Sequence, residues 1–253
     1  MKKVIIIPAR LSSSRLKNKV LLDLKGKTIL QRVFEKCIKV NDAVVYIATD
    51  SKRIQNSCLN YTSNVIMTSV RHKSGTERVI EALKNLQYDF AVNVQADEPF
   101  INPLLIEKIF EELIKKNVQV VTACTRLFNS DELFDSNTVK LVKDINNNAL
   151  YFSRSCIPHL SKKNQILLDQ KKFFNEVPFF KHIGIYGFKR NFINNYSSLK
   201  KSNLENIEML EQLRILESGF KINVVESKFK SIGIDTEENY IRAKEIMEFK
   251  FNN

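Results

Sequence analysis

Short β-branched apolar runs alternate with amphipathic stretches through the first half of this chain, and this alternation constrains the fold more than any other feature. The runs expected as strands are 4–9, 44–50, 64–69, 90–95 and 119–125. The stretches expected as helices are 29–40, 51–59, 76–86 and 103–116. Strands that alternate with helices pair in parallel, because each helix returns the chain to the same end of the sheet. The pattern predicts an α/β fold with a mainly parallel sheet flanked by helices.

The rhythm changes after Asn129. Segments 138–144 and 148–154 are typical of a β-hairpin that turns at 145–148. Further strands are expected at 181–190 and 221–227, and helices at 204–218 and 236–249. The polar stretch 161–176 is the only candidate for a flexible segment. The second half is therefore expected to make the sheet mixed and to add a smaller hairpin lobe.

Length and composition fit one large or two unequal domains with a substantial core, since 43% of the 253 residues are hydrophobic and 27% are charged. The amino terminus, MKKVIIIPARL, has only a short apolar run before Pro8 and Arg10. Neither a signal peptide nor a membrane span fits that pattern, so a cytoplasmic location is expected. The cysteines lack CxxC spacing and are expected to be reduced structural thiols. They are Cys37, Cys58, Cys124 and Cys156.

The formal net charge of +12 raises the question of nucleic-acid binding, because clustered Lys and Arg neutralise phosphates. Here the lysines are spread over nearly every expected helix, often beside Asn and Ile. A Lys- and Asn-rich proteome produces that bias without selection for binding. The charge therefore does not favour a polynucleotide partner, although it would steer an anionic small substrate towards a cleft.

The segment NVQADEP places Asp97 at the end of an apolar run, FAVNV, where its carboxylate cannot stay buried. Such an aspartate either caps the turn before Pro99 or holds a cation, and this segment alone leaves both interpretations open. Ligands of open α/β sheets gather at the carboxyl ends of the strands. Together with phosphate-seeking groups elsewhere in the chain, Asp97 favours a site for a phosphate substrate with Mg²⁺.

The segment IIPARLSSSRLKNK begins where the first strand ends and carries three cations, Arg10, Arg15 and Lys19. Triphosphates need several fixed donors, and Arg offers a planar fork where Lys offers a compact charge. A solvated basic loop is the alternative, but nucleotides usually bind at this position of an α/β sheet. The segment is neither a P-loop nor a GxGxxG fingerprint, which removes the main support for a kinase or a dehydrogenase.

The segment HKSGTER presents Ser74, Gly75 and Thr76 at the start of an expected helix. Backbone N–H groups and the helix dipole favour an anion or a base edge there, and Glu77 suits the first turn. An ordinary helix cap explains the Ser and Thr equally well. This segment alone does not decide between the two.

A series of motifs along the chain carries a family resemblance. In order they are IIPAR, SSRL with Lys19, GKTIL, ATD, SGTER, NVQADEP, YFSRSCIP, HIGIYGF, LENIEMLEQLR and GIDTEENY. From Val4 to about Ala243 the chain resembles the 3-deoxy-manno-octulosonate cytidylyltransferases, which make CMP-KDO. The amino-terminal motifs alone indicate a sugar nucleotidyltransferase, whereas YFSR, HIGIYG and MLEQLR are specific to this family.

The resemblance implies a Rossmann-like nucleotide-diphospho-sugar transferase fold, with residues 1–253 as a single nucleotidyltransferase domain. It places an acceptor-binding and dimerisation subregion at about 130–200. It also implies CTP and KDO as small-molecule substrates, Mg²⁺ as the cofactor and a homodimer, with no nucleic-acid or membrane partner. The product would serve lipopolysaccharide biosynthesis.

Residue by residue, the resemblance assigns three groups of contacts. The CTP phosphates would be bound by Arg10, Arg15 and Lys19, and the rest of the nucleotide by Ala9, Ser74, Thr76 and Arg78. The metal ligands would be Asp97 and Asp235, which form the catalytic set with Lys19. The sugar acid would be held by Gln95, Ser153, Arg154, His182, Tyr186, Glu208 and Glu211, with Arg154 as the partner of its carboxylate.

Several acceptor residues have a structural alternative. His182 and Tyr186 alternate on one strand face and could be a packed polar pair. Arg154 could bridge two strands. Glu208 and Glu211 are three residues apart on the expected helix and could simply face water.

The implied reaction is an in-line attack of the anomeric hydroxyl of an ulosonic acid on the α-phosphorus of CTP, which expels pyrophosphate. Such a transfer depends on positioning and charge neutralisation more than on covalent catalysis. No dedicated general base is obvious, so we expect Mg²⁺ to lower the pKa of the hydroxyl. Lys19 and the arginines would stabilise the leaving pyrophosphate.

Three segments depart from the family's pattern. This chain has RLKNKVL where RLPGKPL is usual, Ala96 where QGDEP is usual, and FKSIGIDTEEN in place of a Pro-Gly-containing approach to GVDTPED. The charged ligands are spared, but a related acceptor stays open, either an 8-amino KDO analogue or a sialic-type nine-carbon acid. Alternatives from other classes are a nucleic-acid-binding protein and a catalytically silent nucleotide-binding protein. The presence of both Asp97 and Asp235 argues against the silent one.

Overall fold

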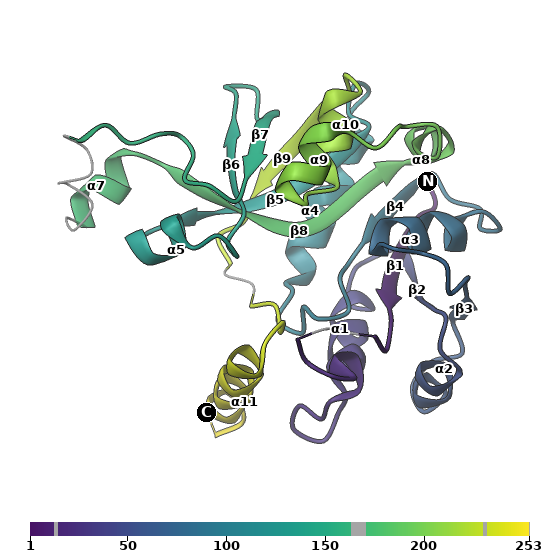
Figure 1. Ribbon diagram of the computed structural model, residues 1–253. Helices are drawn as coiled ribbons and strands as arrows, with labels where there is room; N and C mark the ends of the chain where they lie inside the picture. Colours follow the sequence, from purple (N-terminus) through teal and green to yellow (C-terminus); the bar gives the residue numbers. More distant parts are fainter. Residues whose placement is uncertain (13–14, 163–170, 230–231, 253) are drawn as a thin grey trace. The chain divides into compact units, whose positions relative to one another are not determined.

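The computed structural model describes residues 1–12, 15–162, 171–229 and 232–252. The chain forms two compact units (Figure 1). The first unit comprises Met1–Phe110 and Ser231–Asn253, and the second comprises Glu111–Lys230. The carboxyl-terminal segment thus returns to the unit in which the chain begins. None of the described helices is long and apolar enough to cross a membrane.

The first unit is built on parallel strands, as the alternation predicts. The strands are β1 (Lys3–Ala9), β2 (Ala43–Thr49), β3 (Val65–Met67) and β4 (Phe90–Asn93). Their order is β3-β2-β1-β4, with Ile5 of β1 opposite Val45 on one side and Val92 on the other. Because these strands are parallel, the segments that follow β1 and β4 start at the same edge of the sheet.

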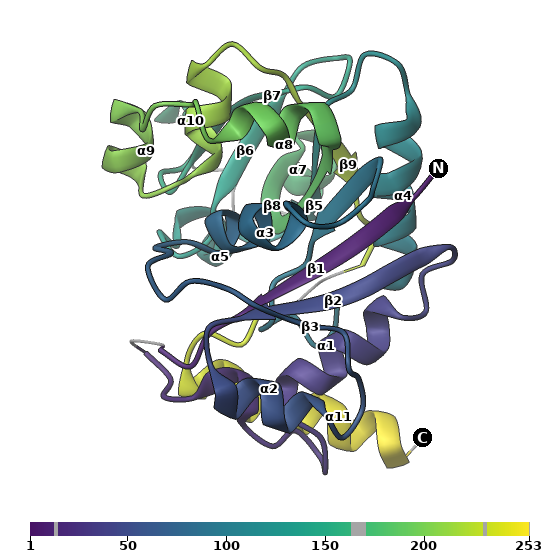
Figure 2. The ribbon, with the colours of Figure 1, turned by 90° about the vertical axis from the view of Figure 1, so that its right-hand side faces the viewer.

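Helices cover both faces of this sheet. Those of the first unit are η1 (Lys19–Leu21), α1 (Ile29–Cys37), α2 (Lys52–Cys58), α3 (Gly75–Leu83) and α11 (Glu237–Asn252), while α4 (Pro103–Ile114) crosses into the second unit. Figure 2 shows α3 on one side of β1 and β2, and α1 and α2 on the other. Thr28, Ser51 and Ser74 begin α1, α2 and α3 by accepting a hydrogen bond from a backbone N–H three residues later.

The last helix, α11, packs against the segment between β1 and α1. The shared cluster consists of Leu16, Leu24, Ile29, Ile234, Tyr240 and Ala243. The Tyr240 hydroxyl donates a hydrogen bond to the backbone carbonyl of Asp23. This packing brings the segment before α11, which carries Asp235, beside the loop that carries Lys19.

The second unit combines antiparallel and parallel pairing. Its strands are β5 (Val120–Leu127), β6 (Lys140–Lys143), β7 (Ala149–Ser153), β8 (Phe179–Lys189) and β9 (Ile222–Glu226). Strand β5 pairs with β8 antiparallel and with β9 parallel. Strand β6 pairs antiparallel with both β7 and β8, and the β6–β7 hairpin stands out in Figure 1. The predicted hairpin and the mixed, mostly parallel α/β architecture are therefore confirmed.

The helices of the second unit are short. They are α5 (Ser130–Phe134), α7 (Lys171–Glu176), α8 (Arg190–Tyr196), α9 (Asn203–Glu208) and α10 (Gln212–Glu217). The sequence pattern does not predict α5, α7 or α8. Part of the stretch expected to be flexible, 163–170, lies outside the described residues. In α7, Phe173 and Phe174 are buried in a cluster with Phe179.

The prediction of one continuous helix over 204–218 is wrong. Helix α9 ends at Glu208, the next residue, Met209, has a left-handed φ of 55°, and α10 begins only at Gln212. Across this break Arg214 donates to both carboxylate oxygens of Glu205, at 2.7 and 2.5 Å. A hydrophobic repeat does not reveal such a break, because apolar positions recur on both sides of it.

The cysteines are free, as predicted. Cys37, Cys58 and Cys124 are buried, and Cys156 is half-buried. Burial raises the pKa of the Cys124 thiol to about 12. The thiol is therefore protonated at neutral pH and is a poor nucleophile.

Candidate active site

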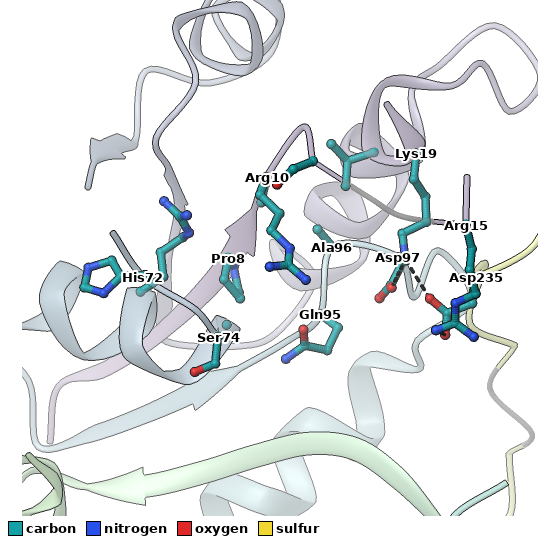
Figure 3. Close-up of a pocket in the computed structure, with 15 residues that line it drawn as sticks. Pro8, Arg10, Arg15, Lys19, His72, Ser74, Gln95, Ala96, Asp97 and Asp235 are labelled. Carbon is teal, nitrogen blue, oxygen red and sulfur yellow. Dashed lines mark hydrogen bonds and ion pairs between the residues drawn. The ribbon is translucent and has the colours of Figure 1, made fainter. Parts of the chain in front are cut away.

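The first unit has a pocket that begins at the carboxyl end of β1 and extends to the segment after β4 (Figure 3). Its lining residues are Pro8, Ala9, Arg10, Ser12, Arg15, Lys19, Val20, His72, Ser74, Gly75, Arg78, Gln95, Ala96, Asp97 and Asp235. The candidates for phosphate, nucleotide and metal are thus brought together, except that Thr76, in the first turn of α3, does not line the pocket. The volume of about 210 Å³ lies below the roughly 300–1,000 Å³ of pockets that enclose a drug-sized ligand. The pocket can therefore enclose only part of a nucleotide.

The loop after β1 supplies exposed cations. Arg10 and Arg15 are both exposed, and Arg15 Nη2 lies 3.6 Å from Asp235 Oδ2. In Figure 3 the Arg10 side chain extends towards Gln95 across the pocket. An exposed guanidinium can turn its fork towards phosphate oxygens without breaking a buried contact.

Lys19 joins the two expected metal ligands. Its Nζ donates to Asp97 Oδ2 at 2.5 Å and to Asp235 Oδ1 at 2.8 Å. Burial disfavours the ammonium, but attraction to Asp97 and the hydrogen bonds to both carboxylates outweigh it and raise the pKa of Lys19. Burial likewise disfavours the Asp235 carboxylate, yet Lys19 and the nearby Arg15 lower its pKa below the ordinary value. Lys19 and Asp235 are therefore both charged at neutral pH.

The main chain fixes the approach of the two aspartates. The N–H of Ile234 donates to the carbonyl of Asp97 at 2.9 Å. Gly233 passes so close to Glu98 that a Cβ there would lie 2.9 Å from Glu98 Oε1. A side chain at Gly233 would therefore have to displace the carboxylate end of the Glu98 side chain, so this glycine of the GIDTEENY motif leaves room for Glu98 beside the site.

The donor set suits Mg²⁺. In phosphate-transfer sites this ion is held by one or two carboxylates together with substrate phosphates and waters. The side chains of Asp97 and Asp235 converge on one ammonium group, so their oxygens can also reach one metal ion. Among the residues that the structure describes, no group of three or more His, Cys, Asp or Glu forms an all-protein metal site. Asp97 and Asp235 therefore fit the implied cofactor.

The start of α3 lies on the pocket. Ser74 Oγ accepts a hydrogen bond from the N–H of Glu77 at 3.2 Å, so the interpretation of Ser74 as a helix cap is confirmed. Ser74 also lines the pocket. A Cβ at Gly75 would lie 3.3 Å from Gln95 Oε1, which makes this a tight position.

Arg78 lines the pocket from within a buried ion pair. Its side chain is 3% exposed, and its Nη2 donates to Asp50 Oδ2 at 2.9 Å. Its Nη1 donates to Thr68 Oγ1 at 2.5 Å. Because Asp50 compensates the guanidinium charge, Arg78 shapes the pocket wall more than it supplies a cation for phosphate.

His72 is a pocket residue that the sequence analysis does not identify. Its Nε2 hydrogen-bonds to Glu81 Oε2, and its Nδ1 lies 3.9 Å from Glu77 Oε2. The one sequence feature that could have identified His72 is its place at the start of the HKSGTER segment, but a single histidine before a helix cap has no distinctive spacing. Ser12 also lines the pocket, and its place in a run of serines is equally uninformative.

Two departures from the family's pattern are accommodated without strain at the metal ligands. Asn18 adopts a left-handed conformation, with φ 53°, which Asn and Gly accept more readily than other residues. Ala96 does not have a positive φ and is buried against the pocket, so no glycine is required there. Both loops therefore keep Lys19 and Asp97 in contact.

Three of the acceptor candidates meet in the second unit. Glu208, the last residue of α9, accepts hydrogen bonds from Ser153 Oγ at 2.6 Å and from the N–H of Arg154 at 2.9 Å. The expectation that Glu208 and Glu211 share one helix is wrong, because Glu211 precedes α10. For Glu208, the alternative that it faces water is also wrong, since its carboxylate binds the end of β7.

The Arg154 side chain is held by the main chain. Its Nε donates to the carbonyl of Glu208 and its Nη1 to the carbonyl of Ser136, each at 3.0 Å. A guanidinium has five N–H donors. These two bonds use two of the donors. The two N–H groups of Nη2 and one N–H of Nη1 make no hydrogen bond to any residue in the described part of the chain and can bind another partner.

His182 and Tyr186 of β8 form the packed pair that was one of the alternatives. Their ring centroids are 5.4 Å apart, and Phe152 packs edge-on against His182 at 5.1 Å. The Thr122 hydroxyl donates to the carbonyl of Ile185 at 2.8 Å. It therefore accepts from His182 Nε2 at 2.9 Å, which assigns the proton to that nitrogen.

The hydroxyl of Tyr186 is buried and makes no hydrogen bond to any residue in the described part of the chain, although Thr122 lies nearby. Burial raises the pKa of Tyr186 well above its ordinary value, and the charge of Glu211 adds to the rise. The remaining acceptor candidate, Gln95, belongs to the first unit, where its amide donates to Asn93 Oδ1 at 3.1 Å.

Comparisons with known proteins identify the family of this chain. A family model described as cytidylyltransferase matches residues 4–227. The 3-deoxy-manno-octulosonate cytidylyltransferase of Neisseria meningitidis serogroup B is 43% identical over 97% of this chain and 98% of its own. The enzyme of that name from Fusobacterium nucleatum subsp. nucleatum is 42% identical over 94% of each chain.

Among solved structures, a CMP:2-keto-3-deoxy-manno-octonic acid synthetase complexed with CTP superimposes with a TM-score of 0.90. It is 34% identical, and the match covers 99% of this chain and 100% of the other. Nearly the whole chain is therefore matched in sequence and in fold. This chain belongs to the 3-deoxy-manno-octulosonate cytidylyltransferase family.

Proposed function

We propose that this chain transfers the CMP group of CTP to 3-deoxy-D-manno-octulosonate, giving CMP-KDO and diphosphate. The observation that carries the proposal is the convergence of Lys19, Asp97 and Asp235 beside an arginine loop, in a pocket at the strand ends. The names of the relatives and the CTP-bound relative support the two substrates. A transfer at phosphorus needs such positioned charges more than a covalent intermediate.

The cations of the pocket would bind the triphosphate. Arg10 and Arg15 are exposed and can turn towards phosphate oxygens. The Lys19 ammonium has three N–H groups, of which two bind the aspartates. The third can reach a phosphate oxygen and stabilise the leaving diphosphate.

The aspartates would hold Mg²⁺, which polarises the attacking hydroxyl and offsets the charge that develops on the α-phosphate. Asp97 and Asp235 are positioned for this by the Ile234 N–H bond to the carbonyl of Asp97. The charge of Lys19 keeps Asp235 ionised. We identify no dedicated general base in the pocket.

The second unit would bind the sugar acid. The unused N–H groups of Arg154 form one edge of the guanidinium, which suits a carboxylate. Ser153 and Glu208 hold that end of β7. His182, Tyr186 and Glu211 are the proposed contacts of this unit to the sugar hydroxyls. Gln95 is the acceptor candidate of the first unit.

Pyrophosphate release tests the proposal. The assay combines CTP, UTP, ATP or GTP with KDO, its 8-amino analogue or sialic acid, with and without Mg²⁺. We expect turnover with CTP and KDO, and only with Mg²⁺. Productive use of UTP with a sugar 1-phosphate would contradict the proposal. A preference for the 8-amino analogue or sialic acid would keep the reaction class and change the acceptor.

Three further expectations belong to this function. A homodimer is supported by apolar side chains that the second unit exposes, namely Leu150, Ile207 and Met209. Residues from about 130 to 200 would form the acceptor and dimerisation subregion of one nucleotidyltransferase domain. A cytoplasmic location would supply CTP, and the product would feed lipopolysaccharide biosynthesis. Light scattering at several concentrations tests the dimer.

A further inference from the structure

Among the described residues of the second unit, Lys140 is the most completely buried cation. It is the first residue of β6, lies opposite Ser153 in the hairpin and is 0% exposed. Its Nζ donates to three backbone carbonyls, those of Asp135 at 2.9 Å, Thr138 at 2.6 Å and Arg154 at 2.5 Å. A buried cation costs stability unless all its donors are satisfied, so such a lysine needs a structural reason.

The three carbonyls match the three N–H groups of an ammonium. Among the described residues, no carboxylate lies within ion-pair distance of Lys140 Nζ. Burial lowers the pKa of Lys140, and the charge of Asp135 opposes that change. The main chain, rather than an acidic side chain, therefore holds this lysine in place.

The carbonyls that Lys140 collects come from the two segments that hold Arg154. One segment is the turn 135–138, closed by a bond from the N–H of Asn137 to Asp135 Oδ1 at 2.9 Å. In the middle of this turn, the carbonyl of Ser136 accepts from Arg154 Nη1 at 3.0 Å. The other segment is the end of β7, where Lys140 binds the carbonyl of Arg154 itself.

We propose that Lys140 is a positioning residue for the acceptor carboxylate: it ties the turn 135–138 to the end of β7, so that the carbonyl of Ser136 aims the Arg154 guanidinium. The inference rests on the proposed function, in which Arg154 binds the sugar acid. The inference adds that the orientation of the Arg154 guanidinium depends on Lys140, which does not itself contact the substrate. Without Lys140, the carbonyls of Asp135, Thr138 and Arg154 each lose a donor, and the turn is free to move away from Arg154.

The test compares Lys140→Met with Lys143→Met. Lys143 is on the same strand, but it donates to Asn147 Oδ1 and Glu226 Oε2 and has no bond to the turn or to Arg154. For Lys140→Met we expect the KM for KDO to rise roughly ten- to hundredfold, since small misplacements of a binding group have effects of that size. The KM for CTP should stay within about twofold, as should both constants in Lys143→Met.

A double-mutant cycle with Arg154→Lys separates positioning from general loss of stability. If Lys140 acts through Arg154, then Lys140→Met should raise the KM for KDO much less in the Arg154→Lys background than in the wild type. The loss in melting temperature should remain similar in both backgrounds. If Lys140→Met raises the KM for KDO by the same factor in both backgrounds, the two residues act independently and the inference is overturned.

The remaining outcomes are also decisive. If the wild type releases no pyrophosphate from CTP and KDO, the proposed function fails and the inference fails with it. If the wild type is active and Lys140→Met has a wild-type KM for KDO, only the inference fails. Should Lys140→Met not fold, Lys140→Arg replaces the compact ammonium by a planar fork that does not match three carbonyls. A folded Lys140→Arg protein with an unchanged KM for KDO would also overturn the inference.

Discussion

In the pocket of the first unit the charged side chains bind one another, whereas in the acceptor cluster of the second unit the cations bind the main chain. Lys19 lies between Asp97 and Asp235, and Arg78 is paired with Asp50. Arg154, by contrast, donates to carbonyl oxygens at Nε and Nη1. Side-chain pairing leaves a cluster that a metal and a triphosphate can rearrange. Main-chain pairing instead fixes a guanidinium in one orientation for a planar carboxylate.

The largest effect is expected from substitutions of the two aspartates in the pocket of the first unit. Asp97→Asn and Asp235→Asn should each fold, because Lys19 keeps one carboxylate partner, but turnover should fall about a thousandfold or more. Loss of one anionic ligand weakens Mg²⁺ binding where the metal must stabilise transition-state charge. Pyrophosphate release at saturating substrates measures this, with the exposed Asp131→Asn as the control. Near-wild-type turnover in either variant would remove that aspartate from the metal site.

A smaller effect is expected at Arg154, where the orientation of the fork matters. Arg154→Lys keeps the charge but loses the planar fork, so acceptor binding should weaken by about 1.5–3 kcal/mol. The KM for KDO should rise selectively while that for CTP hardly changes. Arg126→Lys is the matched control, since Arg126 also donates to main-chain carbonyls, those of Phe174 and Asn175. An equal rise for CTP, or none for either substrate, would make Arg154 a structural or nucleotide contact.

The difference between the two sites also explains what the sequence could predict. In the first unit, strand ends, loop cations and acidic residues occur in short motifs, and parallel pairing brings strand ends to one edge. Lys19 and Asp97 could therefore be placed together in advance. The return of α11, which brings Asp235 to them, follows from apolar packing among distant residues such as Leu16 and Ala243. Only the resemblance anticipated that contact.

The acceptor cluster was less predictable because its geometry depends on irregular backbone. The left-handed turn at Met209 ends α9 and lets Glu208 meet Ser153 and the N–H of Arg154. Hydrophobic periodicity continues through that turn, so the pattern predicted a single helix. The carbonyl of Ser136 that binds Arg154 carries no signal in the residue type at all. Main-chain contacts of this kind can be found only from a structure.

His182, which is half-buried, tests how the acceptor cluster responds to pH. Burial lowers the pKa of His182 to about 3. The unfolded chain, with a histidine pKa near 6.5, binds the proton first, so the free energy of unfolding is complete above about pH 6.5 and falls towards pH 3. Between pH 7.5 and 4.5 this residue should cost about 2.5–3 kcal/mol of stability. In denaturant unfolding, His182→Gln should lose less stability between these two pH values than the wild type does. The control His159→Gln, which replaces an exposed histidine, should lose as much as the wild type. An equal loss in His182→Gln and the wild type would mean that His182 titrates normally.

The smallest expected effect concerns the loop that carries Lys19 and asks whether the first unit also depends on the main chain. Asn18 has a φ of 53°, and its carbonyl accepts from the N–H of Leu21 at 2.9 Å, next to Lys19. A left-handed residue with a Cβ costs about 1–2 kcal/mol, less for Asn than for Ala. Asn18→Ala should therefore lower the free energy of unfolding by about 1 kcal/mol, whereas Asn18→Gly should be nearly neutral because Gly accepts this conformation. Lys17→Ala is the control, since Lys17 is exposed and does not have a positive φ. If Asn18→Ala is as stable as Asn18→Gly, then the left-handed conformation at Asn18 does not affect stability. The pocket of the first unit would then depend on side-chain pairing alone, in sharper contrast to the acceptor cluster.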